Sequence, residues 1–181
     1  MKNILFLTFF IGSFFSTIAQ DEPETDHVKL QQDTKNASVK FKQQISALEY
    51  NSDFEKSTSI SFRVDTFLIQ DFLNRRLEFD YTTRDMTEAF NQAKEEYEKL
   101  INKYYQILYN KVNETDKQAV KSNHESWIAY ETAEIALMRI LYKEDYTGGD
   151  SIQSINYAAD LMHFKKERAL SYYKKLLGFQ M

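Results

Sequence analysis

Glu134 is the acidic residue whose surroundings in the sequence most strongly suggest a specific role. At helical spacing it shares one stripe with four aromatic and aliphatic residues, Trp127, Tyr130, Leu137 and Leu141. An unpaired charge is costly to bury, so either the carboxylate lies in water at the edge of this stripe or a cation from another helix meets it. We expect Arg168 to be that cation, in a structural ion pair. The alternative is a polar patch used for recognition.

Other patterns that could support catalysis or metal binding are missing from the sequence. His27, His124 and His163 lie far apart and have no HExxH spacing. There is no cysteine, no Gly-x-Ser-x-Gly turn, no phosphate-binding glycine loop and no dinucleotide fingerprint. The acids of KEEYEK, residues 94–99, alternate with lysines, which is typical of a solvated helix face. The sequence therefore predicts no catalytic residue, no metal site, no cofactor and no enzymatic activity.

The first 19 residues have the features of a secretory signal peptide. Lys2 precedes an apolar run from Ile4 to Phe15, and the small residues Thr17 and Ala19 come before the expected cut. This apolar run is too short for a confident membrane span, and no later segment approaches the roughly 20 apolar residues that a span requires. No cysteine follows the signal to carry a lipid. We therefore expect a periplasmic or secreted protein that is not a lipoprotein.

Composition predicts one domain with a single core. The chain has 181 residues, 43% of them hydrophobic and 15% aromatic, which suffices for a single core. Since there are no cysteines, helix packing must replace the disulfides that often stabilise small exported domains. Removal of Lys2 with the signal leaves 22 basic against 27 acidic residues, a net charge of −5. This acidic balance argues against nucleic acid as a partner.

Residues 20–61 are polar and predict a leader that is partly disordered or forms a short helix. Val39, Phe41, Ile45 and Leu48 allow such a helix because their spacing is partly helical. A further helix is expected from Asp65 or Thr66 to Leu77.

Three longer helices are predicted in the remainder of the chain. Apolar residues recur at gaps of three and four from Met86 to Leu108, after a capping Thr82 or Thr83, and again from Ile152 to Leu176. Between them, a helix from Val120 to Leu141 is preceded by Thr115 and Gln118 at capping-box spacing and followed by a sharp turn at Gly148 and Gly149. We therefore predict an all-α antiparallel bundle over residues 62–181, with three long helices and a shorter N-terminal helix packed across them.

The position of each tyrosine relative to these apolar stripes predicts whether its side chain is buried or exposed. Tyr97, Tyr104, Tyr130 and Tyr173 lie on the stripes and are expected in the core. Tyr109, Tyr142, Tyr146 and Tyr172 lie off them and are expected to make exposed contacts.

Four short motifs follow one another over residues 82–177. EKLINKYY contains Asn102 and Tyr105, HESWIAYETAEI contains Trp127, Tyr130 and Glu134, GGDS contains Gly148 and Gly149, and KKERALSYY contains Arg168. In order and spacing these motifs resemble the lysozyme-inhibitor LprI-like family of small exported helical domains.

The chain departs from that family pattern at several positions. Ala89 and Ile135 stand where the family has cysteines, and Glu131 and Thr132 replace an Arg–Asp pair. The resemblance implies a binding protein that blocks a lysozyme by occlusion. The alternative is a structural or adaptor module for another envelope protein, without lysozyme-related activity.

Overall fold

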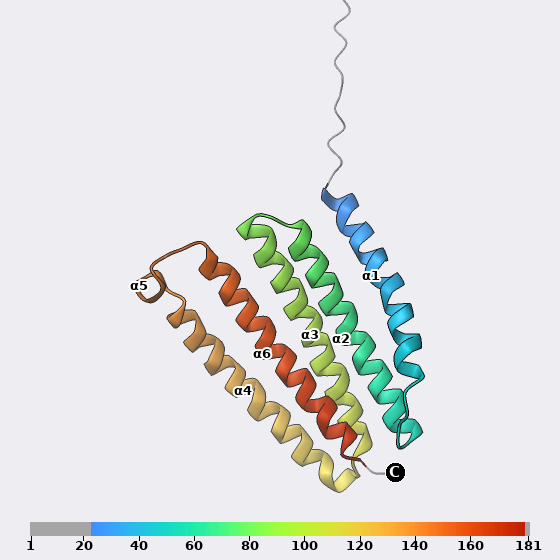
Figure 1. Ribbon diagram of the computed structural model, residues 1–181. Helices are drawn as coiled ribbons and strands as arrows, with labels where there is room; N and C mark the ends of the chain where they lie inside the picture. Colours follow the sequence, from blue (N-terminus) through green and yellow to red (C-terminus); the bar gives the residue numbers. More distant parts are fainter. Residues whose placement is uncertain (1–22, 180–181) are drawn as a thin grey trace, which may run out of the picture.

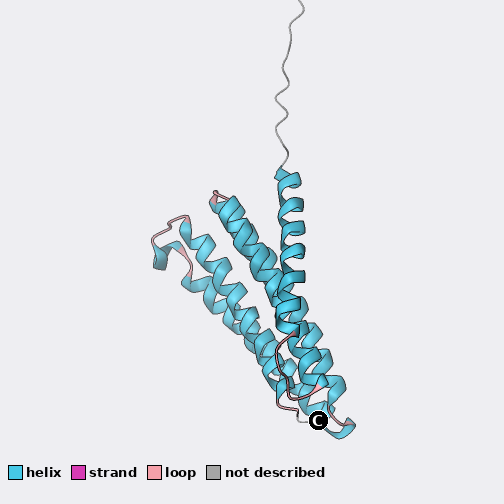
Figure 2. Ribbon diagram, turned by 45° about the vertical axis from the view of Figure 1, so that its right-hand side comes forward, coloured by secondary structure: helices cyan, strands magenta, loops and turns pink. Residues whose placement is uncertain are grey.

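The computed structural model describes residues 23–179, and all regular structure in that range is helical. The elements are α1 (Pro23–Ser46), α2 (Asp53–Phe79), α3 (Thr83–Lys111), the 3-10 turn η1 (Glu114–Asp116), α4 (Lys117–Leu141), α5 (Glu144–Thr147) and α6 (Ile152–Leu177). Figure 2 shows only helices and connecting loops in the described range. The all-α class is therefore confirmed, whereas the predicted signal peptide, residues 1–19, lies outside the described residues.

The long helices lie side by side, and successive ones run in opposite directions. In Figure 1, α6 lies between α3 and α4, while α1 lies on the far side of α2. The most extensive packing is between α3 and α6, and α2 packs against both of them. Short connections between helices favour this antiparallel arrangement, as the sequence predicted.

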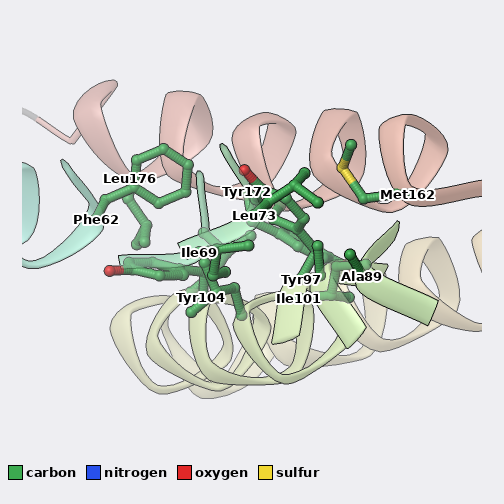
Figure 3. Close-up of a cluster of buried hydrophobic side chains, with 14 residues drawn as sticks. Phe62, Ile69, Leu73, Ala89, Tyr97, Ile101, Tyr104, Met162, Tyr172 and Leu176 are labelled. Carbon is green, nitrogen blue, oxygen red and sulfur yellow. The ribbon is translucent and has the colours of Figure 1, made fainter. Parts of the chain in front are cut away.

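The hydrophobic core lies between α2, α3 and α6. Figure 3 shows how these three helices contribute side chains to it, including Phe62, Leu73, Tyr97, Ile101, Tyr104, Met162, Tyr172 and Leu176. Phe62 stacks on Tyr173 at a centroid distance of 4.1 Å and meets Tyr104 edge-on at 5.0 Å. The predicted stripes on α3 and α6 are largely confirmed, because most of their members are buried or half-buried.

The N-terminal half of the chain is more helical than the sequence suggested. α1 is 24 residues long, although only a short helix was expected there. It is attached to α2 by a stack of Phe41 on Phe67 at 4.5 Å and by a hydrogen bond of 2.8 Å from Thr34 Oγ1 to Asp71 Oδ2. These contacts explain the difference, because most helical stability in proteins comes from packing rather than from local propensity.

The predicted start of the second helix was wrong by nearly four turns, since the observed cap is Ser52 and not Asp65 or Thr66. α2 begins at Asp53, where the Ser52 side chain accepts a hydrogen bond from the Glu55 amide. Asp65 and Thr66 lie inside the helix, where Thr66 Oγ1 donates to the Phe62 carbonyl oxygen. By contrast, the predicted cap of α3 is confirmed at Thr82, whose side chain accepts from the Asp85 amide at 3.0 Å.

A buried ion pair joins the end of α2 to its neighbours. The Arg76 and Asp80 side chains are 4% and 5% exposed, and Arg76 Nε donates to Asp80 Oδ2 at 2.8 Å. Arg76 also donates to Gln92 Oε1 of α3 at 3.0 Å, and His27 Nε2 of α1 lies 3.3 Å from Asp80 Oδ1. The Arg76–Asp80 pair thus links the end of α2 to α3 through Arg76 and to α1 through Asp80.

α4 turns a different face to the bundle from the one that the sequence predicted. On α4 and its C-cap the half-buried residues are Lys117, Val120, His124, Trp127, Glu131, Glu134, Ile135, Met138 and Tyr142. Three residues that were predicted to lie beside Trp127 on the inner face are instead exposed: Tyr130 (54%), Leu137 (48%) and Leu141 (53%). The predicted stripe is therefore rotated, and α4 buries no residue fully.

Polar residues on the inner face of α4 explain this rotation. His124 bonds to the Tyr172 hydroxyl, and Glu131 forms an ion pair with Lys165. A stripe chosen for its hydrophobicity omits such polar residues. Their partners lie on α6, more than 30 residues away in the chain, so the local sequence does not indicate that these side chains are paired.

Candidate functional site

Three of the predicted motif residues, Tyr105, Trp127 and Arg168, meet at the junction of α3, α4 and α6. We call the group at this junction the Trp127 cluster and define it as Tyr105, His124, Trp127, Phe164, Lys165, Arg168 and Tyr172. His124 stacks on Tyr105 with a centroid distance of 4.0 Å. Trp127 lies between His124 and Phe164, with centroid distances of 6.2 Å to each. Because His124 and Trp127 are three residues apart on one helix, their rings face the bundle together.

Arg168 is enclosed by the rings of this cluster. Its guanidinium carbon lies 5.0 Å from the Trp127 ring centroid and 4.2 Å from that of Tyr172, within cation–π range. One terminal nitrogen donates to the Tyr172 hydroxyl at 2.6 Å and to Asn123 Oδ1 at 3.1 Å. Arg168 Nε is buried without a hydrogen-bond partner among the described residues. Arg168 therefore fastens α6 to the first half of α4.

The hydrogen bonds around Tyr172 favour a neutral His124. Since Arg168 donates to the Tyr172 oxygen, the hydroxyl hydrogen is free to bond His124 Nδ1, which lies 2.8 Å away and must then be unprotonated. Burial lowers the pKa of His124 below its ordinary value, and the charge of Arg168 lowers it further, against opposing effects of Glu125 and Glu131. Geometry and charge thus favour the same protonation state.

We expect this histidine to make the fold sensitive to mild acid. Because the pKa of His124 is lowered in the folded state, its contribution to stability is complete above the ordinary value of about 6.5 and is lost as the pH falls toward the folded pKa. His124→Gln should therefore reduce the loss of unfolding free energy between about pH 7.5 and about pH 5.5, as measured by urea titration. His163→Gln is the matched control, because His163 is exposed. An unchanged pH dependence in His124→Gln would contradict the assignment.

Lys165 is the second cation of the cluster and the more deeply buried one, with a side chain that is 6% exposed. Its ammonium group forms ion pairs with Glu131 of α4 and, at 3.1 Å, with Glu98 of α3. It also lies 5.4 Å from the Trp127 ring centroid. Lys165 therefore connects all three helices that form the cluster.

The predicted ion pair between Glu134 and Arg168 is wrong. Arg168 bonds to Asn123 and Tyr172, and Glu134 is half-buried with no ion pair among the residues that the structure describes. The cause is the register across the glycine turn, since Glu131 lies opposite Lys165, not Arg168. Glu134 follows Glu131 by three residues, and Arg168 follows Lys165 by three residues. Because α4 and α6 run in opposite directions, these two steps add, and they separate Glu134 from Arg168 by about 9 Å along the helices.

The other predicted site residues are distributed around the cluster. Tyr130 lies at its edge, 5.8 Å from Phe164, and Asn102 is exposed on α3. Gly148 and Gly149 form the sharp turn that was expected, with φ angles of +79° and +73°. A Cβ atom at Gly149 would lie only 2.8 Å from Glu144 Cγ. The roles of these residues in recognition stay predictions.

Three polar residues of this junction were not predicted to lie there: His124, Glu131 and Lys165. Two of them, His124 and Glu131, lie at gaps of three and four residues in the series from Val120 through Trp127 to Met138. A helical face defined by this spacing alone, with polar residues included, would have contained both. Tyr172, expected at the surface, is fully buried. Its burial follows from its position on the same face of α6 as Lys165 and Arg168, seven and four residues earlier.

The arrangement of the cluster is suited to joining helices rather than to transferring atoms. Each cation is held by rings or carboxylates, and the one histidine is bonded to a tyrosine. Within residues 23–179 no group of three or more acids and histidines is placed to hold a metal ion. None of the helices in the same range is long and apolar enough to cross a membrane.

The comparison with protein families bears directly on this junction. The family model for lysozyme inhibitor LprI matches residues 78–171, which is 94 of the 181 residues. The chain belongs to the LprI lysozyme inhibitor family. The match extends from the end of α2 into α6, so the LprI region contains every member of the Trp127 cluster except Tyr172. The resemblance seen in the motifs is thus confirmed. A search of curated proteins and one of solved structures found no match.

Proposed function

We propose that the mature chain is an exported binding protein that inhibits a lysozyme by covering its substrate cleft. The observation that carries this proposal is the match to the LprI family over α3, α4 and α6. The features of residues 1–19 support export to the periplasm or the exterior, where a lysozyme would be encountered. In this proposal the chain is not an enzyme and acts only by binding.

Net charge supports the choice of partner. The mature chain has 27 acidic and 22 basic residues, so a cationic lysozyme would be attracted to it over long range. Electrostatic attraction of this kind accelerates association and weakens as salt screens the charges. A second candidate function is an adaptor for another envelope protein. It is favoured by Glu131, which stands where the family pattern has an arginine and which pairs with Lys165, so that it is not free to contact a partner.

A lysis assay should separate these two functions. Purified residues 20–181 are titrated against a panel of lysozymes that includes strongly cationic ones, and cell-wall lysis is followed at low and at physiological salt. We expect dose-dependent inhibition that weakens as salt is added, because steering contributes to encounter. Unchanged lysis across the panel, with a folded and monodisperse sample, would reject the inhibitor and favour the adaptor.

A further inference from the structure

The outer face of α4 and α5 is apolar and, apart from the contact of Tyr130 with Phe164, has no partner in the described chain. We define this outer face by Tyr130, Leu137, Ile140, Leu141 and Tyr146, which are 46–68% exposed. Neither α4 nor α5 buries any residue, whereas α2, α3 and α6 each bury several. Figure 1 shows α4 at the edge of the bundle, with α6 on one side only. Exposed apolar residues gathered on one helix are typical of a surface that binds another protein.

Four acids adjoin this outer face. Glu134 is half-buried at the border between this face and the inner face of α4, and the exposed Glu144, Asp145 and Asp150 follow at the turn. None of these four forms an ion pair within the described chain. Apart from Glu131, which pairs with Lys165 on the inner face, residues 128–152 contain four acids and two bases, a charge of −2. The exposed apolar surface thus lies beside a local excess of acids.

We infer that the outer face of α4 and α5 is the docking surface for a cationic protein, which is a lysozyme if the proposed function holds. The charge of this face distinguishes the two simplest candidates for its partner, a second copy of this chain and a cationic protein. A second copy would place two surfaces of charge −2 against each other, and like charges in contact disfavour association. A cationic partner instead gains attraction from the acids and burial of the tyrosine and leucine side chains at the centre.

The exposed apolar residues of α1 provide a contrast. Val28 and Val39 are 61% and 58% exposed, so this helix also presents apolar surface. However, α1 contains four lysines and three acids, a charge of +1. Its surface therefore lacks the attraction for a cationic partner that the outer face of α4 and α5 offers.

A pair of matched variants tests the inference. The first combines Leu137→Ser with Asp145→Lys on the outer face. The control combines Leu48→Ser with Glu49→Lys in the loop between α1 and α2. Leu137 and Leu48 are 48% and 50% exposed, and both variants change the net charge equally. Circular dichroism and thermal unfolding establish that each variant is folded.

Binding is measured by titration calorimetry against the lysozyme that the wild-type chain inhibits most strongly. The outer-face variant should bind at least about tenfold more weakly, whereas the control should stay within about threefold of the wild type. If both variants bind like the wild type, or both weaken equally, the docking surface is elsewhere although inhibition itself stands. If the wild-type chain binds no lysozyme, the proposed function fails and the inference fails with it. Sedimentation showing a wild-type dimer that the outer-face variant dissociates would overturn the inference in favour of self-association.

Discussion

Replacing Arg76 with methionine should lower the free energy of unfolding by about 3–5 kcal/mol. Methionine retains much of the side-chain volume but removes the charge that faces Asp80, whose side chain is 5% exposed. The carboxylate would then lie buried with only His27 nearby, at 3.3 Å. Removal of one partner from a buried pair is costly because the remaining charge has lost its hydration without compensation. Urea unfolding monitored by circular dichroism provides the measurement.

The adjacent residue supplies the control. Arg75 also pairs with an acid four residues away, Asp71, at 2.6 Å, but the two side chains are 33% and 23% exposed. Arg75→Met should therefore cost less than about 1 kcal/mol, since water can hydrate the remaining carboxylate. Equal losses for the two substitutions would show that burial does not govern the contribution of Arg76.

Replacing Lys165 with methionine should lower the free energy of unfolding by about 2–4 kcal/mol. The expected cost is smaller than for Arg76, since Glu98 is 52% exposed and can return to water. Glu131 is only 12% exposed and would lose its partner beside Trp127. The loss should be greatest in α4, which has no fully buried residue to hold it against the bundle. Hydrogen exchange should therefore show faster opening of α4 than of α3.

A double variant distinguishes an unpaired charge from a loss of packing. Lys165→Met combined with Glu131→Leu removes both charges, and well-packed apolar residues often replace a buried ion pair without loss. We expect the double variant to recover more than half of the stability that Lys165→Met loses, in a double-mutant cycle. If Glu131→Leu adds further destabilisation instead, the aliphatic part of Lys165 is the more important contribution.

These substitutions also connect stability to the proposed binding. α4 carries the outer face, and Lys165 and Arg168 hold α4 against the bundle. A loosened α4 would present its apolar residues in many arrangements, and ordering them on binding would weaken affinity. The cluster therefore has a positioning role that differs from direct contact with a partner.

Local sequence determined α3, α4 and α6 and most of their boundaries, but not the length of α1 or the start of α2. The 3-and-4 spacing on α3 and α6 requires one buried stripe on each helix, and residues such as Tyr97, Ile101 and Met162 lie there. Thr82 and the glycine pair act on their immediate neighbours, through a side-chain hydrogen bond and through positive φ angles. Such effects depend on a few adjacent residues, and hence can be read from the chain itself.

Only the tertiary structure decided which face of α4 is buried and which cation meets which acid. The sequence offers two stripes on α4, and the more apolar one, with Leu137 and Leu141, is exposed. The buried one contains Glu131, which is stable there because Lys165 of α6 neutralises it. That partner depends on the register across the turn, because the three-residue steps from Glu131 to Glu134 and from Lys165 to Arg168 together separate the predicted pair by about 9 Å along the helices. Local spacing cannot fix this register, since it is set by the simultaneous packing of three helices.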